Sequence, residues 1–292
     1  MEKISRGGRL VNSLARVLKM KEQPLNIKNK DYPYYFSSPT KTILKKYHVD
    51  KMVVCNKNVY IINKKKENDR TNKVILYFHG GSFVYNFTAF HWRFIDKLIS
   101  FSNCNIVAPD YPLAPESSCL DTIHMVFELY KILKATYETK NIILMGDSAG
   151  GGLCLSLLQL LKKENIMQPK KAILLSPWLD ITLTNPEIEK IDKNDPFLEK
   201  SSLIYAGAMY ARNLDYKNYL VSPIYGDLDL SCKIYVFSGT YDILNADSLE
   251  LVKKSVHHKI NYYEYSKMIH CFMFLKIPEA NDVFLKILKI IK

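Results

Sequence analysis

The feature that most constrains this chain is a glycine-rich turn placed between two apolar runs. Directly after a strand candidate at 141–145, and directly before the apolar helical run 153–161, the chain reads Gly146-Asp147-Ser148-Ala149-Gly150-Gly151. The chain has only 11 glycines, and glycine is needed where φ is positive or another segment approaches closely. A serine on a sharp turn from strand to helix requires such flanking glycines, and the turn exposes its hydroxyl. The pattern therefore predicts a nucleophile elbow with Ser148 at its tip.

Backbone amides close to this serine are candidate donors to an oxyanion. The elbow leaves the amide of Ala149 unpaired at the N-terminus of the following helix. A second glycine cluster follows the strand candidate 74–78 and reads His79-Gly80-Gly81-Ser82-Phe83. Consecutive glycine amides can converge on one small volume. We expect Gly80, Gly81 and Ala149 to bind the oxyanion, with His79 as a structural anchor of the loop.

A serine hydroxyl needs a base, and the base needs a third group to orient it. His270 follows the last strand candidate, which places it in the chain order serine, acid, histidine. Asp242 lies just beyond the strand candidate 233–237, at the edge of the sheet where such sites assemble. Asp247 is the weaker candidate for the acid, since it falls inside the helix that follows. We therefore predict that Ser148, Asp242 and His270 form a catalytic triad.

From residue 74 onward, short apolar runs alternate with longer helical stretches, which is typical of parallel βαβ architecture. The strand candidates are 74–78, 105–108, 141–145, 171–175, 233–237 and 260–265, and the helix candidates are 88–101, 120–135, 149–163, 246–257 and 280–291. Ahead of them, 49–55 and 59–62 bracket Asn56-Lys57-Asn58 and predict an antiparallel hairpin. We expect an α/β fold with a twisted, mostly parallel sheet and helices on both faces.

The first 20 residues show the pattern of an amphipathic basic helix. Apolar residues recur at helical spacing while arginines occupy other faces: Leu10, Val11, Leu14, Val17 and Leu18 against Arg6, Arg9 and Arg16. Three interpretations compete, namely a helix packed on the same protein, a membrane-surface anchor, and a transit peptide. The first is the ordinary case and is our expectation.

Length, composition and charge limit the function classes. With 292 residues, 48% of them hydrophobic and 24% charged, the chain has the proportions of a folded protein of one domain plus an elaboration. Its formal net charge of +12 comes mainly from lysines scattered along the sequence. An AT-rich genome also produces that pattern, and no groove-reading motif accompanies it. No nucleic-acid partner is therefore expected.

Cysteine usage and hydropathy predict the compartment. The six cysteines form no C-x-x-C pair and no tight framework, which favours free thiols in a reducing compartment. No apolar stretch approaches the roughly 18 residues of a membrane span, and the first 20 residues lack the core of a secretion signal. We expect a cytoplasmic protein with no transmembrane segment. The sequence leaves the oligomeric state open, a homodimer included.

Together these motifs resemble those of the hormone-sensitive-lipase-like branch of the α/β-hydrolases, which includes many bacterial carboxylesterases. The branch's H-G-G-G-F/W, Y-R-L-A-P-E, G-D-S-A-G-G and S-P-W segments are similar to residues 79–83, 111–116, 146–151 and 176–178. Asp242 and His270 fall in its G-x-x-D-x-L and H-x-F settings. The chain departs from the pattern at Ser82, which replaces a glycine, at Pro112, which replaces an arginine, and at 119–122, where F-P-A-A is absent.

The resemblance implies an α/β-hydrolase fold with a central sheet of about eight strands and a helical cap above the active site. Residues 46–292 would form the catalytic domain. The cap would combine an N-terminal helical segment, 1–45, with an insertion at about 181–222, where prolines and aromatic residues interrupt the alternation of strands and helices. The resemblance implies no cofactor and no metal.

The expected activity is hydrolysis of short- to medium-chain carboxylic esters, which are small-molecule substrates, through an acyl-enzyme. One alternative is a non-catalytic small-molecule receptor on the same fold, like the plant gibberellin receptor, which has lost the histidine that this chain retains as His270. A second is an amide or peptide hydrolase with the same machinery. A third is a membrane-associated lipase that uses the basic N-terminal helix.

Overall fold

A single sheet organises the part of the chain that the structure, a computed structural model, describes: residues 4–22, 36–64, 72–255 and 260–292. Within these ranges the sheet has eight strands in the order β1-β2-β4-β3-β5-β6-β7-β8. The strands are β1 (His48–Val54), β2 (Lys57–Asn63), β3 (Val74–Phe78), β4 (Asn105–Pro109), β5 (Ile142–Asp147), β6 (Lys171–Leu175), β7 (Lys233–Tyr241) and β8 (Asn261–Ile269). The strands from β3 to β8 pair in parallel. The predicted α/β fold is confirmed.

Burial explains which strands lie at the centre of the sheet. All five residues of β3 and all six of β5 are buried, because helices cover both faces. At the edge, β1 and β2 form the predicted antiparallel hairpin, and β2 pairs antiparallel with β4. The hairpin turn comes earlier than the sequence predicts, since Cys55 and Asn56 take its positive φ values of 47° and 61°.

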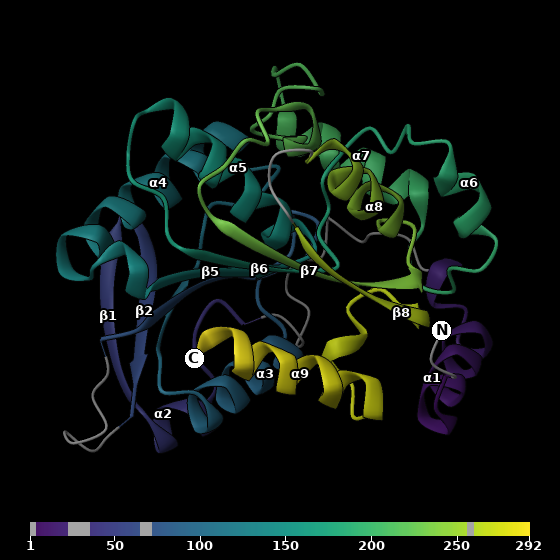
Figure 1. Cartoon of the computed structure of the whole chain (residues 1–292), viewed down its shortest axis with the longest axis horizontal. Coiled ribbons are helices and arrows are strands. Elements are labelled where there is room, and N and C mark those ends of the chain that lie inside the picture. Colours follow the sequence, from purple (N-terminus) through teal and green to yellow (C-terminus); the bar gives the residue numbers. More distant parts are fainter. Residues whose placement is uncertain (1–3, 23–35, 65–71, 256–259) are drawn as a thin grey trace.

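Helices form a layer on each side of the sheet (Figure 1). The α-helices are α1 (Arg6–Val17), α2 (Lys41–Lys46), α3 (Ala89–Phe101), α4 (Cys119–Thr136), α5 (Ala149–Lys163), α6 (Glu187–Asp192), α7 (Lys200–Ala211), α8 (Asn245–Lys254) and α9 (Pro278–Ile291), and the short 3-10 helices are η1 (Met20–Glu22), η3 (Thr139–Asn141), η4 (Pro223–Tyr225) and η5 (Phe272–Phe274). None of the helices described combines the length and hydropathy that crossing a bilayer requires.

Alternate strand residues supply two apolar cores, one on each face of the sheet. Leu76 and Leu144 pack into the core that α4 and α5 cover, whereas Ile75 and Ile143 pack into the core beneath α3 and α9. Figure 1 shows α4, α5 and α8 on one side of the sheet and α3 and α9 on the other. The two faces therefore have separate cores.

The stretch 181–222 contains α6 and α7 and contributes no strand, as the sequence predicts. Both helices lie on the α8 side of the sheet (Figure 1), and α6 contacts α8 and β7. This stretch therefore lies beside α8 and β7, among the later strands of the sheet.

The N-terminal helix α1 packs on the same protein, but through the face that the sequence did not predict. Its buried residues are Gly8, Asn12 and Ala15, and it contacts β8 and α9. Most of the predicted apolar row faces solvent instead, with Val17 77% exposed and Leu10, Leu14 and Leu18 also exposed, whereas Val11 packs partly against the core. Small residues and a hydrogen bond from Asn12 Nδ2 to the carbonyl of Lys267 let the helix approach closely. Residues 23–35, within the predicted N-terminal cap segment, lie outside the described residues.

Candidate active site

Ser148 occupies the sharp turn between β5 and α5. Its backbone has a φ of 50° and a ψ of −120°, which is a strained conformation for a residue with a side chain. A Cβ on Gly146 would lie 2.3 Å from the carbonyl oxygen of Gly150, and a Cβ on Gly150 would lie 2.1 Å from that of Phe78. The packing therefore excludes side chains at both flanking positions. Ser148 has the backbone geometry of a nucleophile elbow.

The neighbour of the serine, Asp147, anchors the loop that carries the first glycine cluster. Its Oδ1 accepts a hydrogen bond from Tyr77 Oη at 2.6 Å, and its Oδ2 lies 3.2 Å from His91 Nε2. Burial opposes the charge on this carboxylate, but His91 and Tyr77 outweigh burial and hold the pKa of Asp147 below its ordinary value. The amide of Gly80 donates to the same Oδ2 at 3.0 Å. The sequence predicts this amide as an oxyanion donor, whereas the structure gives it to Asp147.

Three other amides around Ser148 remain available as donors. Those of Gly81, Ser82 and Ala149 donate to no acceptor among the residues that the structure describes. Gly81 and Ser82 take positive φ values of 115° and 54°, so the loop turns tightly at both. Sequence reasoning missed Ser82 because it took the glycines of the cluster as the donors, although any residue type carries the amide.

His79 holds this loop from behind. It is fully buried, and its ring stacks on Tyr111 with 4.3 Å between ring centroids. Its Nδ1 lies 2.6 Å from the carbonyl oxygen of Gly80. Burial lowers the pKa of His79 to about 3, so the ring is neutral at physiological pH. These contacts fit a structural anchor.

The predicted acid and base meet at the carboxyl ends of β7 and β8. His270 Nδ1 lies 2.9 Å from Asp242 Oδ2, and both side chains are buried. The other carboxylate oxygen of Asp242 accepts from the amide of Leu244 at 3.0 Å. Burial alone would lower the pKa of His270, but the charge of Asp242 outweighs it and holds the pKa well above 6.5. The hydrogen bond to Asp242 occupies Nδ1 of the imidazole, so Nε2 is the nitrogen that can accept a proton.

The Nε2 atom of His270 has a different neighbour from the one that the sequence predicts. It lies 3.4 Å from Cys271 Sγ, while Ser148 Oγ makes no hydrogen bond to any residue in the described ranges. Cys271 takes a left-handed backbone with a φ of 52°, which turns its thiol toward the ring. The structure thus joins His270 to Asp242 and does not join His270 to Ser148 by a hydrogen bond.

The weaker candidate for the acid lies elsewhere. Asp247 is in the first turn of α8 and accepts a hydrogen bond from Asn185 Nδ2 at 2.9 Å, and it does not contact His270. Within the described parts of the chain, no group of three or more His, Cys, Asp or Glu side chains is arranged to hold a metal ion.

Two residues of the stretch between α6 and α7 border the acid–histidine pair, and sequence reasoning passed over both. The ring of Phe197 stacks on His270 with 6.1 Å between centroids. Asp195 accepts a hydrogen bond from the amide of Ile243, next to Asp242, at 2.9 Å. The only sequence signal for Asp195 is an acidic residue directly before a proline within an otherwise irregular insertion.

Comparison with known proteins identifies the class that this fold and site define. A family model described as an alpha/beta hydrolase fold matches residues 75–274. An esterase from Acinetobacter venetianus is 31% identical over 217 residues, which cover 72% of this chain and 71% of that protein. A triacylglycerol lipase from Mycobacterium tuberculosis is 29% identical over 187 residues, 64% of this chain and 38% of that protein. The chain belongs to the alpha/beta hydrolase family, as its motifs predict.

Solved structures share this fold. A crystal structure of EstE5 superposes with a TM-score of 0.87 at 21% identity, covering 99% of this chain and 98% of that one. An esterase of the bacterial hormone-sensitive lipase family superposes with a TM-score of 0.81 at 22% identity, covering 100% and 98%. At these identities the likeness concerns the fold.

Proposed function

We propose that the protein is a serine carboxylesterase that hydrolyses short- to medium-chain carboxylic esters through an acyl-enzyme. One observation carries the proposal. Ser148 lies on a strained elbow after β5, and the hydrogen-bonded pair of Asp242 and His270 lies after β7 and β8 of the same sheet. Relatives named as an esterase and a triacylglycerol lipase support ester hydrolysis as the reaction class.

Each residue has a chemical role in this proposal. Ser148 Oγ attacks the ester carbonyl, and His270 Nε2 accepts its proton and then delivers it to the leaving alcohol. Asp242 fixes the tautomer of the ring and stabilises its cation. A water molecule, activated by the same nitrogen, then releases the acid. Because Nε2 lies beside Cys271 in this structure, the ring exchanges that contact for Ser148 Oγ when the reaction begins.

Backbone amides stabilise the tetrahedral intermediate. We assign this role to Gly81, Ser82 and Ala149, whose amides have no protein acceptor in the described residues, and we no longer assign it to Gly80, which donates to Asp147. Loss of one such donor typically lowers kcat by about 10²–10³. The positions of these amides near the elbow support a site built for an oxyanion.

We also propose that the N-terminal segment, 1–45, and the insertion, about 181–222, act together as the cap over the catalytic domain, 46–292. Arg16 donates to the carbonyl of Asn194 at 2.8 Å, and Lys21 forms an ion pair with Asp192. The ring of Phe197 then covers His270. These contacts support a roof that limits the length of the acyl chain.

The proposal is tested with p-nitrophenyl esters from acetyl to palmitoyl and the inactive control Ser148→Ala. We expect the highest kcat/KM on the shorter chains and a loss of about 10⁴-fold or more in the variant, because such triads act as units. Near-normal turnover by S148A, purified from an esterase-deficient host, would overturn the serine mechanism. Binding of esters without any hydrolysis by the wild type would favour the receptor instead.

A further inference from the structure

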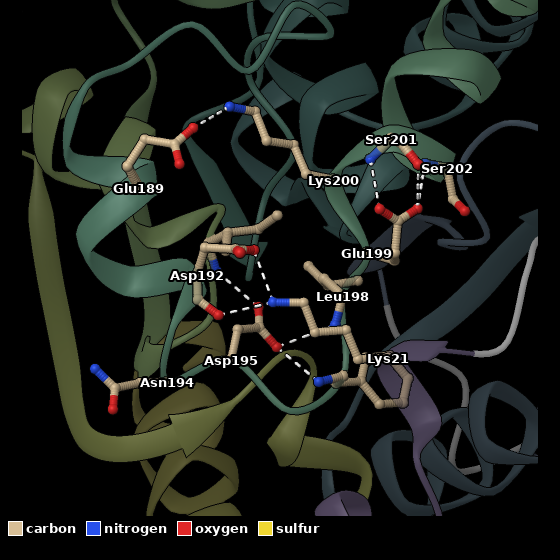
Figure 2. Close-up of polar contacts among 12 residues, drawn as sticks. Lys21, Glu189, Asp192, Asn194, Asp195, Leu198, Glu199, Lys200, Ser201 and Ser202 are labelled. Atoms are coloured by element: carbon tan, nitrogen blue, oxygen red, sulfur yellow. Dashed lines mark hydrogen bonds and ion pairs between the residues drawn. The ribbon is translucent and has the colours of Figure 1, made fainter.

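A short segment between α6 and α7, residues 192–198, connects the N-terminal helix region to the acid–histidine pair. At one end, Lys21 Nζ contacts both the side chain and the carbonyl of Asp192, at 2.8 and 2.7 Å. At the other end, Phe197 lies on the His270 ring. Figure 2 shows Asp192 facing Lys21, with Asp195 further along the segment beside Leu198. Asp195 lies midway between these contacts.

Asp195 is a buried carboxylate that uses both oxygens on backbone amides. Only 2% of the surface of Asp195 is exposed to solvent. Oδ1 accepts from the amides of Phe197 and Leu198 at 2.8 and 3.0 Å, which closes a tight turn within the segment. Oδ2 accepts from the amide of Ile243 at 2.9 Å, which lies in a different part of the chain. One side chain therefore fastens both Phe197 and the loop that carries Asp242.

The charge of this carboxylate is not balanced by a base. No lysine, arginine or histidine in the described ranges forms an ion pair with Asp195, and the side chain lies close enough to Asp242 to interact with its charge. Burial and the negative charge of Asp242 raise the pKa of Asp195 to about 6. An acid buried without a cation is costly, so its position beside the predicted triad points to function rather than to stability.

We propose that Asp195 is a positioning residue for the triad: through the amide of Ile243 it sets the loop of Asp242, and through that of Phe197 it sets the ring that covers His270. This inference rests on the proposed function, because it takes Asp242 and His270 as the working acid and base. Asp195 touches no reacting atom, so it acts only through these partners.

Asp195 also places a negative charge close to Asp242, the group whose own charge favours the imidazolium of His270. The titratable groups that act on the pair of Asp242 and His270 are Asp195, Cys271 and Tyr262, while Asp192 and Lys21 face one another at the far end of the segment. Removal of a nearby negative charge makes the imidazolium less favourable and lowers the pKa of His270. The acid limb of the pH–rate profile must therefore move to lower pH when Asp195 is neutralised.

Asp195→Asn is the sharpest variant because it keeps the size of the side chain but offers one acceptor oxygen to three amides. We expect kcat for p-nitrophenyl butyrate to fall about 10–100-fold through misplacement of the acid loop. We expect the loss to fall mainly on kcat and much less on KM, because Asp195 acts on the loop of the acid rather than on a reacting atom. We also expect the acid limb to move to lower pH, and the proton resonance of His270 Nδ1–H, bound to Asp242, to shift.

Glu199→Gln is the matched control. Glu199 is an acid on the same stretch of chain that also accepts from two amides, those of Ser201 and Ser202, but among the described residues it makes no hydrogen bond to the triad. We expect E199Q to leave the acid limb and the Nδ1 resonance unchanged. Asp192→Asn is a second control, at the far end of the segment, and should also leave the acid limb and the Nδ1 resonance unchanged. If D195N does not fold, as judged by urea unfolding, D195S keeps a short acceptor and is measured instead.

The outcomes separate this proposal from the one that it rests on. If D195N or D195S leaves kcat unchanged, or lowers kcat while the acid limb and the Nδ1 resonance stay in place, Asp195 is merely structural and the positioning role is wrong. If S148A, measured in parallel, retains the activity of the wild type, the proposed esterase mechanism is wrong whatever D195N does. Loss of activity in S148A together with the expected shifts in D195N supports both.

Discussion

His270 and Asp242 are joined by a buried hydrogen bond of 2.9 Å between Nδ1 and Oδ2, and this bond governs how the site responds to pH. Burial favours a neutral ring, yet the carboxylate outweighs it and raises the pKa of His270 well above 6.5. A general base works only when it is neutral. The raised pKa therefore moves the acid limb of activity upward, into the neutral to alkaline range.

The first prediction follows from that sign. We expect kcat/KM for p-nitrophenyl butyrate to reach half its maximum above pH 6.5, when rates from pH 5 to 9.5 are corrected for spontaneous hydrolysis. Asp242→Asn should move this midpoint to lower pH, since the imidazolium loses its partner, and should lower kcat about 10⁴-fold, as in serine hydrolases generally. A wild-type midpoint at or below pH 6 contradicts the raised pKa of His270.

Cys271 is the subject of the second prediction. Its thiol lies 3.4 Å from the Nε2 atom that must accept the serine proton. Burial raises the pKa of Cys271 to about 11 although His270 opposes the rise, so the group stays a thiol at neutral pH. We expect Cys271→Ala to keep or increase kcat, because it removes a competitor for Nε2.

Thiol modification provides a second measurement of the same contact. Methyl methanethiosulfonate converts a thiolate to a methyl disulfide, and at Cys271 this should slowly inactivate the enzyme at pH 8 and be reversed by dithiothreitol. C271A should resist the reagent, whereas Cys55→Ala, which removes an exposed thiol, should remain sensitive. Equal inactivation of C271A would show that the sensitive thiol is elsewhere.

The third prediction concerns stability and Asp247. Burial raises the pKa of Asp247 from 3.8 to about 7, and its Oδ2 has no partner among the described residues. The folded state therefore binds this proton more tightly than the unfolded state, so the stability it contributes is present below pH 3.8 and is lost as pH rises to about 7. The position in the first turn of α8 favours the charge by only about 0.3–1 kcal/mol, less than the burial cost.

Asp247→Asn mimics the protonated form and should remove this loss. We expect D247N to raise the free energy of unfolding by about 1–3 kcal/mol at pH 8 and to have little effect near pH 4, as measured by urea titration. Glu250→Gln, on the same helix but partly exposed, should change stability by no more than about 0.5 kcal/mol at either pH. A gain of equal size at both pH values would mean that the effect is not electrostatic.

Strands and motifs were predictable where a local property decides the structure. The ranges of β3 and β6 match the sequence prediction because strands buried on both faces are rich in consecutive apolar residues, all five in β3 and the last four in β6. The elbow at Ser148 was predictable because its glycines stand in one short run of sequence between a strand and a helix, although Gly150 is required by the distant Phe78. The fold, the family and the candidate triad follow from such local signals.

Other features depend on partners that are distant in the sequence. Whether the amide of Gly80 is free depends on Asp147, which reaches it from the next strand in the sheet. The buried carboxylate of Asp195 likewise depends on a hydrogen bond from the amide of Ile243, which is distant in the sequence. No periodicity or motif encodes either contact, so the sequence indicated the kind of site but not which amides and carboxylates were already bound.

The face of α1 is the clearest case, and it leads to the last prediction. Helical periodicity shows that a helix has two faces but not which of them meets the protein, and here Gly8, Asn12 and Ala15 pack inward because small residues allow close approach.

Leu14→Ser combined with Val17→Ser, in the exposed row, should change the free energy of unfolding by no more than about 0.5 kcal/mol. Ala15→Asp, at a position 2% exposed, should destabilise the protein by roughly 1–3 kcal/mol or detach the helix, because it buries an unpaired charge. Urea unfolding compares the variants, and limited proteolysis near residue 20 detects detachment. If the two serines destabilise the protein more than the aspartate does, the helix packs through its leucine face, as the periodicity alone predicts.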